Sequence, residues 1–193
     1  MINLKDNDLL FAKVKPNAII PSKEDENAGY DIYACFDEDF ILIPPGDTKL
    51  IPTGIASALS EKYYLQVHER GSTGTKGMKY GAGVIDSGYR NEIFICINNI
   101  NNVEIIISKL DKEELFKKYG QEYYEDEIGI EYDNGLYAFK DGEYPAIIYP
   151  YSKAIAQLVV HEVPKMDVKE ITYEELKAIP SKRGMGALGS SGK

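Results

Sequence analysis

Short apolar runs separated by turn-forming residues dominate the hydrophobic pattern of this chain. Val, Ile, Tyr and Phe gather in these runs, with Pro, Gly and Asn between them, as where Pro44-Pro45-Gly46 follows residues 40–43. No helical segments alternate with the runs, so a parallel sheet built from βαβ units is not expected. The pattern predicts an all-β fold, a sandwich or jelly roll. The expected strands are residues 9–14, 30–34, 40–43, 64–67, 93–98 and 155–160.

One segment departs from the β pattern and predicts a helix. Asp111 can cap this helix, and Glu114 three residues later completes a capping box. Leu110 and Leu115 stand at the two positions of a hydrophobic staple, and Gly120 is expected to end the helix.

A hairpin is expected after this helix. Apolar residues at 128–132 and 136–139 flank Asp133-Asn134-Gly135, and Asn-Gly is a strong signal for a tight hairpin turn. We therefore expect residues 102–146 to form a small helix-plus-hairpin insert in the β domain.

The composition fits one globular domain with a short terminal arm. The chain has 193 residues, of which 44% are hydrophobic and 27% charged, which is too apolar for a wholly disordered chain. We expect a single β domain over residues 1–182 and a flexible Gly/Ser-rich C-terminal arm over residues 183–193.

The charge and hydropathy exclude two classes of partner. The 22 Lys and Arg against 31 Asp and Glu give a formal net charge of −9, so direct binding to a nucleic-acid backbone is not expected and an anionic ligand must be held locally. No apolar run approaches the roughly 20 residues that span a bilayer, and the N-terminus lacks the apolar core of a signal peptide. We expect a cytoplasmic protein without a membrane partner.

Cysteines and histidines are too few to predict a metal centre. Cys35 and Cys96 each lie in a strand-like run and are expected to be reduced and structural. His68 and His161 stand far apart in the sequence, so a zinc site built by the protein is not expected.

Two segments combine cations, hydroxyls and glycines in a way that suits phosphate. Residues 69–77 carry Arg70 and Lys76 among Gly, Ser and Thr, whose backbone amides can converge on oxygen atoms. Residues 183–193 offer Arg183 with successive Gly and Ser amides. Taken singly, the first is equally well a solvated turn and the second a mobile terminus.

A third segment, residues 81–92, suits a nucleoside. Its glycines let the backbone approach a flat ligand whose edge main-chain groups can bind. Asp86 can orient and deprotonate a water molecule, and Tyr89 offers a ring against which a sugar can pack. Asp86-Ser87-Gly88 is also an ordinary hairpin turn.

Five segments resemble, in chain order, the five motifs of trimeric dUTPases. The resemblance covers essentially the whole chain outside residues 102–146, and the third motif is the most specific. The five segments are residues 28–32, 70–72, 83–90, 155–158 and 183–192.

The resemblance implies a jelly-roll homotrimer that hydrolyses dUTP to dUMP and pyrophosphate with Mg²⁺. Each active site would use residues from three subunits, and Mg²⁺ would bind through the substrate phosphates without a direct protein ligand. Similar inserts are known in bacteriophage members, so the chain resembles a phage-type member that would act in the host cytoplasm.

The resemblance also assigns roles to individual residues. Asp86 would activate the attacking water, with Asp31 in a supporting role, and Tyr89 would pack on the deoxyribose. The backbone of residues 81–85 would bind uracil, and the arm would close over the γ-phosphate. The substrate-binding residues implied in this way are Arg70, Gly71, Ser72, Gly81, Ala82, Gly83, Ile85, Tyr89, Gln157, Arg183, Leu188, Gly189, Ser190 and Ser191.

Three positions depart from the usual motifs. Gly71 replaces a Ser, Ala154 replaces an Arg, and Leu188 stands where an aromatic residue usually covers uracil. A side chain without a π face is expected to weaken closure over the base and raise KM.

Two alternatives to a dUTPase remain open at this stage. One is a relative of dCTP deaminase, which shares the fold. The other is a nucleotide-gated regulator that binds a protein partner through the insert, whose tyrosines fit the aromatic enrichment of interfaces.

Overall fold

The computed structural model describes residues 3–119, 130–131, 137–138 and 146–184. By its internal contacts the chain divides into a unit of residues 1–163 and a terminal unit of residues 164–193. The unit that holds the β body therefore ends at Val163, and the expected domain range of residues 1–182 stays a prediction.

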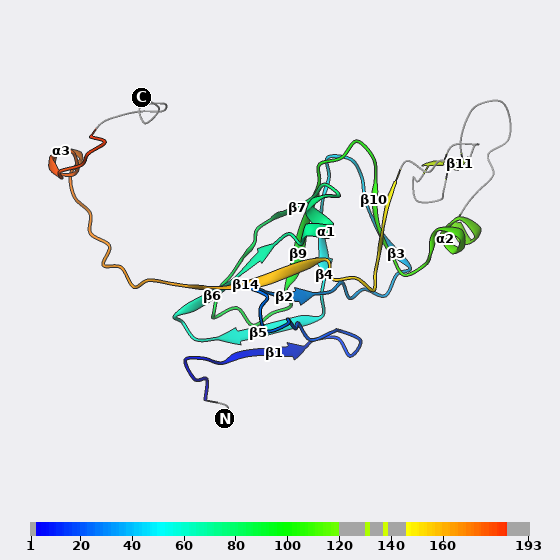
Figure 1. The fold of residues 1–193 in the computed structure, drawn as a ribbon, viewed down its shortest axis with the longest axis horizontal. Helices are drawn as coiled ribbons and strands as arrows, with labels where there is room; N and C mark the ends of the chain where they lie inside the picture. The colour runs from blue at the N-terminus through cyan, green and yellow to red at the C-terminus, as the bar shows by residue number, and fades with distance from the viewer. Residues whose placement is uncertain (1–2, 120–129, 132–136, 139–145, 185–193) are drawn as a thin grey trace. The chain divides into compact units, whose positions relative to one another are not determined.

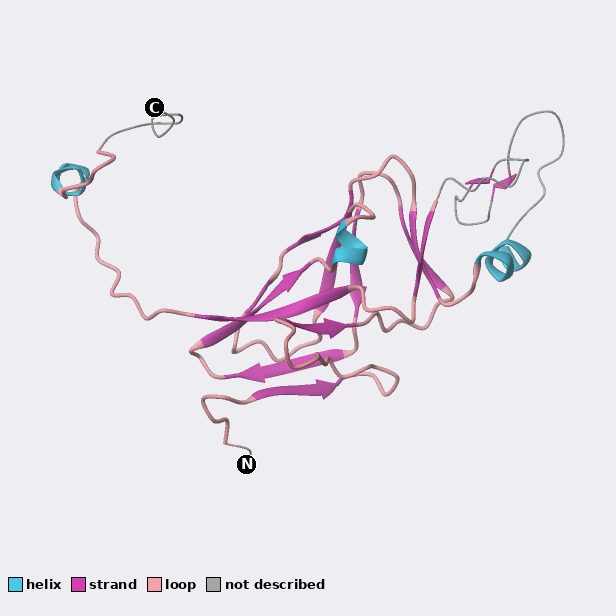
Figure 2. Ribbon diagram, in the orientation of Figure 1, coloured by secondary structure: helices cyan, strands magenta, loops and turns pink. Residues whose placement is uncertain are grey.

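Mainly antiparallel strands build the β body, which confirms the all-β prediction (Figures 1 and 2). One sheet has the strand order β2-β14-β6-β8, and two others have the orders β4-β9-β7 and β13-β10-β3, while β1 pairs with β5. The strands of the first sheet are β2 (Gly29–Ile32), β14 (Ala156–Glu162), β6 (Tyr63–His68) and β8 (Val84–Ile85). The remaining strands of the body are β1 (Leu9–Lys13), β3 (Phe40–Ile43), β4 (Thr48–Pro52), β5 (Ile55–Leu59), β7 (Met78–Gly81), β9 (Phe94–Asn99), β10 (Ile105–Ser108) and β13 (Ile147–Pro150).

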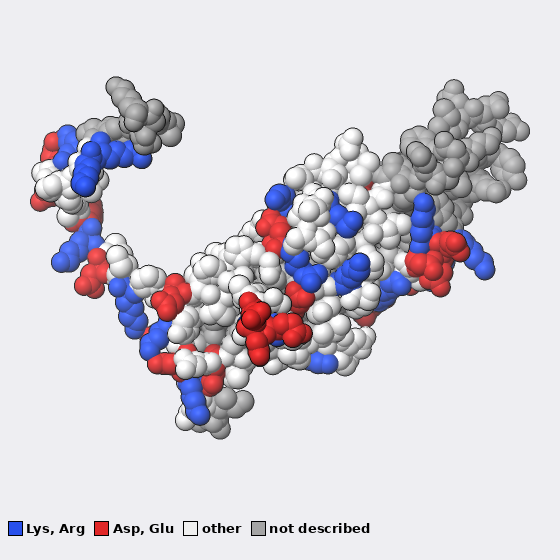
Figure 3. Space-filling model, in the orientation of Figure 1, with Lys and Arg blue, Asp and Glu red and all other residues white. Residues whose placement is uncertain are grey.

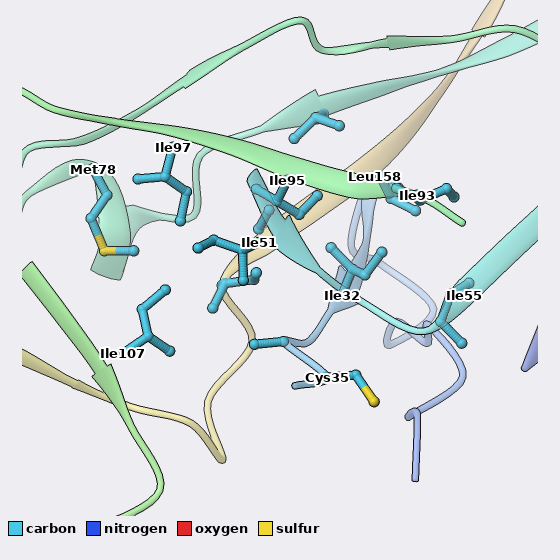
Figure 4. Packing of buried hydrophobic residues seen from close by; sticks show 14 of the residues in the cluster. Ile32, Cys35, Ile51, Ile55, Met78, Ile93, Ile95, Ile97, Ile107 and Leu158 are labelled. Atoms are coloured by element: carbon cyan, nitrogen blue, oxygen red, sulfur yellow. The ribbon is translucent and has the colours of Figure 1, made fainter. Parts of the chain in front are cut away.

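Alternating side chains of these strands form one hydrophobic core (Figure 4). In β9, Ile95 and Ile97 are fully buried, and Cys96 between them is only partly buried. Ile32 of β2, Ile51 of β4 and Leu158 of β14 are also fully buried in the same cluster. Strands of several sheets thus bury their inward faces together, as a sandwich requires.

The helix predicted from Asp111 is confirmed as α2 (Lys112–Tyr119). The Asp111 side chain accepts a hydrogen bond from the Glu114 backbone N–H at 2.9 Å, and the Asp111 N–H donates to the Glu114 carboxylate at 3.2 Å. Leu115 is buried in a satellite cluster against which Leu110 packs. The expected end of the helix at Gly120 lies outside the described residues.

The hairpin is confirmed where it is described. β11 (Ile130–Glu131) pairs antiparallel with β12 (Tyr137–Ala138). The turn residues between them lie outside the described residues.

β10 lies inside the range expected for the insert, about residues 102–146, and packs with the core strands. Ile105, Ile106 and Ile107 are fully buried, and β10 pairs antiparallel with β3 and parallel with β13. Parallel neighbours need a long crossover connection, and the chain between Ser108 and Ile147 provides it. The added segment therefore begins after β10 and also produces the parallel pair that the strand pattern did not predict.

Two short helices were not expected from the sequence. α1 (Gly71–Gly74) follows Arg70 in the β body. α3 (Tyr173–Ala178) lies in the terminal unit, where the Thr172 hydroxyl accepts from the Glu175 N–H at 3.2 Å and the Glu175 carboxylate accepts from the Thr172 N–H at 2.8 Å. The hydrogen bonds that the Glu175 carboxylate accepts from the Thr172 N–H and the Thr172 hydroxyl hold the pKa of this carboxyl below its usual value. The signal for α3 was therefore present in the sequence as a Thr-x-x-Glu capping box.

The two histidines, distant in sequence, lie on adjacent strands. The ring centroids of His68 on β6 and His161 on β14 are 6.0 Å apart, and Tyr64 stacks on His161 at 5.3 Å. β6 pairs with β14, so the two histidines lie on neighbouring strands, with His68 opposite Gln157 and His161 opposite Tyr64. The sequence spacing could not indicate this pairing.

Among the described residues, no helix is both long and apolar enough to span a bilayer. On the face shown in Figure 3, acidic and basic side chains are interspersed over the β body.

Candidate functional site

The residues expected to bind phosphate, which come from three of the five motifs, lie together in one hollow of about 370 Å³. β2 and the turn before it, the start of α1 and the start of β14 form its walls. The lining residues are Asn27, Ala28, Gly29, Asp31, Arg70, Gly71, Ser72 and Gln157.

Arg70 is held in this hollow by a two-pronged ion pair with Asp31. The Arg70 Nε and Nη2 groups donate to the two carboxylate oxygens of Asp31 at 2.8 and 2.9 Å. A third hydrogen bond runs from Nη1 to the Ala154 carbonyl at 3.3 Å. Because the guanidinium has five N–H donors in a fixed fork, this arrangement orients it and leaves donors for a ligand.

The surroundings keep Arg70 positively charged. Partial burial alone would lower the pKa of the Arg70 guanidinium, but the charge and hydrogen bonds of Asp31, together with Tyr149, outweigh it and raise the pKa. The side chains of Arg70 and Asp31 are 30% and 32% exposed, so the pair is accessible to a ligand from the hollow. A fixed cation of this kind suits a phosphate group.

The short helix α1 begins at this arginine because Thr73 folds back onto it. The buried Thr73 hydroxyl accepts from the Arg70 N–H at 3.0 Å and donates to the Arg70 carbonyl at 3.1 Å. Gly71 and Ser72 thereby lie at the rim of the hollow. A Cβ atom placed on Gly71 would meet nothing within 4 Å, so the departure from Ser at this position is not imposed by packing.

Gln157 is positioned by a backbone contact and by a glycine. Its side-chain amide donates to the Glu69 carbonyl at 2.7 Å. A Cβ atom on Gly29, which lies on the neighbouring strand β2, would stand 2.4 Å from the Gln157 Oε1 atom. Gly29 is therefore needed for Gln157 to occupy this place, a role that the sequence did not indicate although the residue lies in the first motif.

A second hollow, of about 180 Å³, gathers residues of the third motif. Asp86 is exposed at its edge, directly after the buried Ile85 of β8. Of the residues implied for the nucleoside, Ala82, Ile85 and Tyr89 line this hollow, whereas Gly81 and Gly83 do not. The lining residues are Ala82, Val84, Ile85, Asp86, Tyr89, Ile93 and Phe94.

Hydrogen bonds order the turn that carries Asp86 and Tyr89. The Tyr89 N–H donates to the Asp86 carbonyl at 3.0 Å, and the Tyr89 hydroxyl donates to the Glu92 carbonyl at 2.9 Å. Arg90 donates to the carbonyls of Ser87 at 2.5 Å and Tyr89 at 3.1 Å. The turn is therefore held in a defined conformation by its own hydrogen bonds and is more than a solvated connection.

The chain changes sheets just before Asp86. Residues 82–83 link β7 of one sheet to β8 of another, and Ala82 has a positive φ of 48°. The Gly83 carbonyl accepts from the Val67 N–H at 2.8 Å, and a Cβ atom on Gly83 would lie 2.6 Å from the Gln66 Nε2 atom. The backbone of Gly83 thus lies close against β6, and a larger residue here would require the Gln66 side chain to move.

The two hollows share no lining residue. The structure therefore joins Asp31, Arg70, Gly71, Ser72 and Gln157 in one place and Asp86 and Tyr89 in another. Val84, from the segment expected to bind uracil, belongs to the second hollow, as do Ile93 and Phe94, which sequence reasoning missed. Phe94 is 43% exposed. An exposed apolar side chain beside a hollow can contribute to ligand binding, and only the structure shows this exposure.

The arm is described only at its start. Arg183 and Gly184 are exposed in the terminal unit. The expected contacts of Leu188, Gly189, Ser190 and Ser191 lie outside the described residues.

Carboxylates in the first hollow are not free to hold a metal ion by themselves. Both oxygens of Asp31 accept from Arg70. In the described part of the chain, no three His, Cys, Asp or Glu side chains cluster in a way that could hold a metal. A divalent cation at this site would need ligand oxygens from a bound molecule such as a triphosphate.

Comparison with known proteins points to one family. The dUTPase family model matches residues 15–112. A deoxyuridine 5′-triphosphate nucleotidohydrolase of Leptospira interrogans is 35% identical over 103 residues, which cover 51% of this chain and 70% of the relative. A protein of the same name from Debaryomyces hansenii is 30% identical over 179 residues, which cover 92% of this chain and 82% of the relative.

A solved structure of the Staphylococcus bacteriophage 80alpha dUTPase with dUpNHpp has a similar fold. Its TM-score is 0.63 at 23% identity, with 97% of this chain and 99% of that chain covered. This likeness confirms the jelly-roll prediction.

Proposed function

Because the chain belongs to the dUTPase family, we propose that it hydrolyses dUTP to dUMP and pyrophosphate. The observation that carries the proposal is the first hollow, where Arg70, fixed by Asp31, lies beside Gln157. An oriented, permanently charged guanidinium next to an amide suits a polyphosphate. The second hollow adds an exposed carboxylate beside a tyrosine ring, which suits a nucleoside and its hydrolysis.

We propose that Asp86 is the general base. Its carboxylate would take a proton from a water molecule that attacks phosphorus, and pyrophosphate would leave. Tyr89 would pack against the deoxyribose and disfavour a ribose 2′-hydroxyl, while backbone groups of residues 81–85 would bind uracil. Arg70 and Gln157 would hold phosphate oxygens and stabilise negative charge that develops during attack.

Mg²⁺ is proposed as the cofactor. The engagement of Asp31 by Arg70 fits an ion bound through the substrate phosphates and not directly by the chain. When bound, it would neutralise phosphate charge and favour attack at phosphorus. Chelation of Mg²⁺ by EDTA is expected to abolish turnover, and added Mg²⁺ to restore it.

We propose a homotrimer with shared active sites. The separation of the phosphate-type and nucleoside-type residues into two hollows of one chain supports this arrangement, because a second subunit can bring one hollow to the other. The arm from Arg183 onward, with Leu188, Gly189, Ser190 and Ser191, would then close over the nucleotide.

Release of dUMP and pyrophosphate from dUTP with Mg²⁺ tests the function, with dCTP, dTTP and UTP run in parallel. The parent should hydrolyse dUTP selectively, and Asp86→Asn should lower kcat by at least about a hundredfold while dUTP still binds. Turnover of dCTP to a deaminated product would favour the deaminase alternative. Tight dUTP binding without turnover in the parent would favour the regulator.

A docking role for the segment between β10 and β13 stays a prediction, because most of that segment lies outside the described residues. A cytoplasmic location likewise stays a prediction.

A further inference from the structure

A buried tyrosine outside the five motifs lies behind Arg70. Tyr149 is on β13, the strand that follows the inserted segment, and its side chain is 1% exposed. Its hydroxyl donates to the Ala154 carbonyl at 2.7 Å. The same carbonyl accepts from Arg70 Nη1 at 3.3 Å, so one backbone oxygen joins Tyr149 to the arginine of the phosphate hollow.

A second tyrosine secures the next peptide of this connection. Tyr80 of β7 donates its hydroxyl to the Ile155 carbonyl. Burial raises the pKa of the Tyr80 hydroxyl, so it stays a protonated donor at neutral pH. Two tyrosine hydroxyls from different sheets, one buried and one partly buried, therefore hold residues 154–155 immediately before β14 begins.

Residues 154–155 contact Arg70 through the Ala154 carbonyl. Ala154 is buried and has no polar side chain, so only its backbone oxygen can contact the guanidinium. Asp31 holds the Nε and Nη2 side of the fork, and Ala154 holds Nη1. A displaced Ala154 carbonyl would therefore change the orientation of the guanidinium in the hollow.

We propose that Tyr149 is a positioning residue for Arg70 and sets how well the hollow binds the phosphates of the substrate. This inference rests on the proposed function for the identity of the substrate. Loss of the Tyr149 hydroxyl leaves the Arg70–Asp31 pair in place but frees the Ala154 carbonyl to move. Phosphate binding weakens in the ground state and the transition state alike, so KM rises while kcat changes little.

The test compares Tyr149→Phe with Tyr151→Phe. Tyr151 is a neighbouring tyrosine whose ring packs against Phe36, and it does not line the hollow. KM for dUTP and Kd for a non-hydrolysable imido analogue of dUTP are measured for each variant. We expect Tyr149→Phe to raise both about threefold to tenfold with kcat within about twofold of the parent. Tyr151→Phe should leave both constants unchanged.

A double-mutant cycle with Arg70→Lys separates positioning from general destabilisation. Lys cannot contact Asp31 with two nitrogens and Ala154 with a third, so Tyr149 has no fork left to orient. Adding Tyr149→Phe to Arg70→Lys should change Kd for the analogue by less than about twofold. Thermal unfolding of all variants reports any loss of folded protein.

Unchanged KM and Kd in Tyr149→Phe, or an equal effect in the Arg70→Lys background, would overturn the inference and leave the proposed function intact. A parent that binds the analogue without hydrolysing dUTP would overturn the proposed function alone, and Kd values would still decide the role of Tyr149. A parent that neither binds the analogue nor turns over dUTP would overturn both.

Discussion

At the scale of single residues, the ion pair between Arg70 and Asp31 is the contact that fixes the charge in the first hollow. It is partly shielded from water, has two hydrogen bonds, and is supported by the Ala154 carbonyl. The pair of Lys62 with Asp6 provides a contrast, since its side chains are 57% and 67% exposed. Exposed pairs of this kind contribute little to stability because solvent screens them and the side chains lose entropy.

We expect Asp31→Asn to weaken both folding and substrate binding. The amide cannot accept two charge-assisted hydrogen bonds, so the free energy of unfolding should fall by about 1–2 kcal/mol. KM for dUTP should rise because Arg70 loses its orientation. Urea denaturation and steady-state kinetics measure these effects, and Asp6→Asn serves as the exposed control with a change below about 0.5 kcal/mol.

Gly29 permits a second test of the hollow. In Gly29→Ala the new methyl group must displace the Gln157 side chain, since its Cβ would lie 2.4 Å from Oε1 and 2.9 Å from Cβ of Gln157. We expect KM to rise at least about fivefold, because Gln157 loses its contact with the Glu69 carbonyl. The control is Gly74→Ala, where the Cβ would meet only Glu69 at an ordinary 3.6 Å. A normal KM in Gly29→Ala would exclude Gln157 from substrate binding.

At the scale of elements, α2 shows how local signals and one buried contact define a helix. Its capping box satisfies backbone donors in the first turn, and Leu115 attaches the helix to β10 through the cluster that contains Ile106. The helix has only eight residues, so it would not be stable without these contacts.

Asp111→Ala should loosen α2 without unfolding the β body. Loss of an N-cap costs about 1 kcal/mol, so amide exchange within α2 should become roughly fivefold faster, while the amides of β9 keep their protection. Glu113→Ala, in the same turn but without a capping contact among those described, is the control. Equal exchange in the two variants would show that the cap does not stabilise the helix.

At the scale of the whole molecule, the two hollows are separate, so an oligomer with a complete site would have to bring them together. One chain presents the phosphate-type and nucleoside-type residues in hollows that share no lining residue. A trimer that joins the first hollow of one subunit to the second hollow of its neighbour would complete the site.

Subunit complementation tests this arrangement. Asp86→Asn and Arg70→Ala are each expected to be inactive, but trimers mixed from both contain some sites with a native Asp86 and a native Arg70. After joint unfolding and refolding we expect up to about a quarter of parental activity for random mixing. Sedimentation should give three times the chain mass of 21.6 kDa. No recovered activity in mixed trimers would place the whole site in one chain.

Local chemistry explains what the sequence alone predicted well. The strands from Leu9, Phe40 and Phe94 and the capped helix at Asp111 follow from side-chain periodicity and hydrogen bonds between near neighbours, which need no knowledge of the fold. The motifs, matched in chain order, likewise contain most of the residues that line the two hollows. Asn27 and Phe94 are among the lining residues that lie outside the motifs.

Only the tertiary structure decided which distant residues meet. Pairing of β6 with β14 places His68 and His161 on neighbouring strands, β10 joins the core because β3 and β13 flank it, and the Ala154 carbonyl accepts from both Tyr149 and Arg70. These contacts depend on how sheets pair and pack, and residues far apart in the chain leave no local pattern that records such pairing. The sequence therefore determined the elements and the candidate residues of the site, and the packing of strands determined which of them lie together.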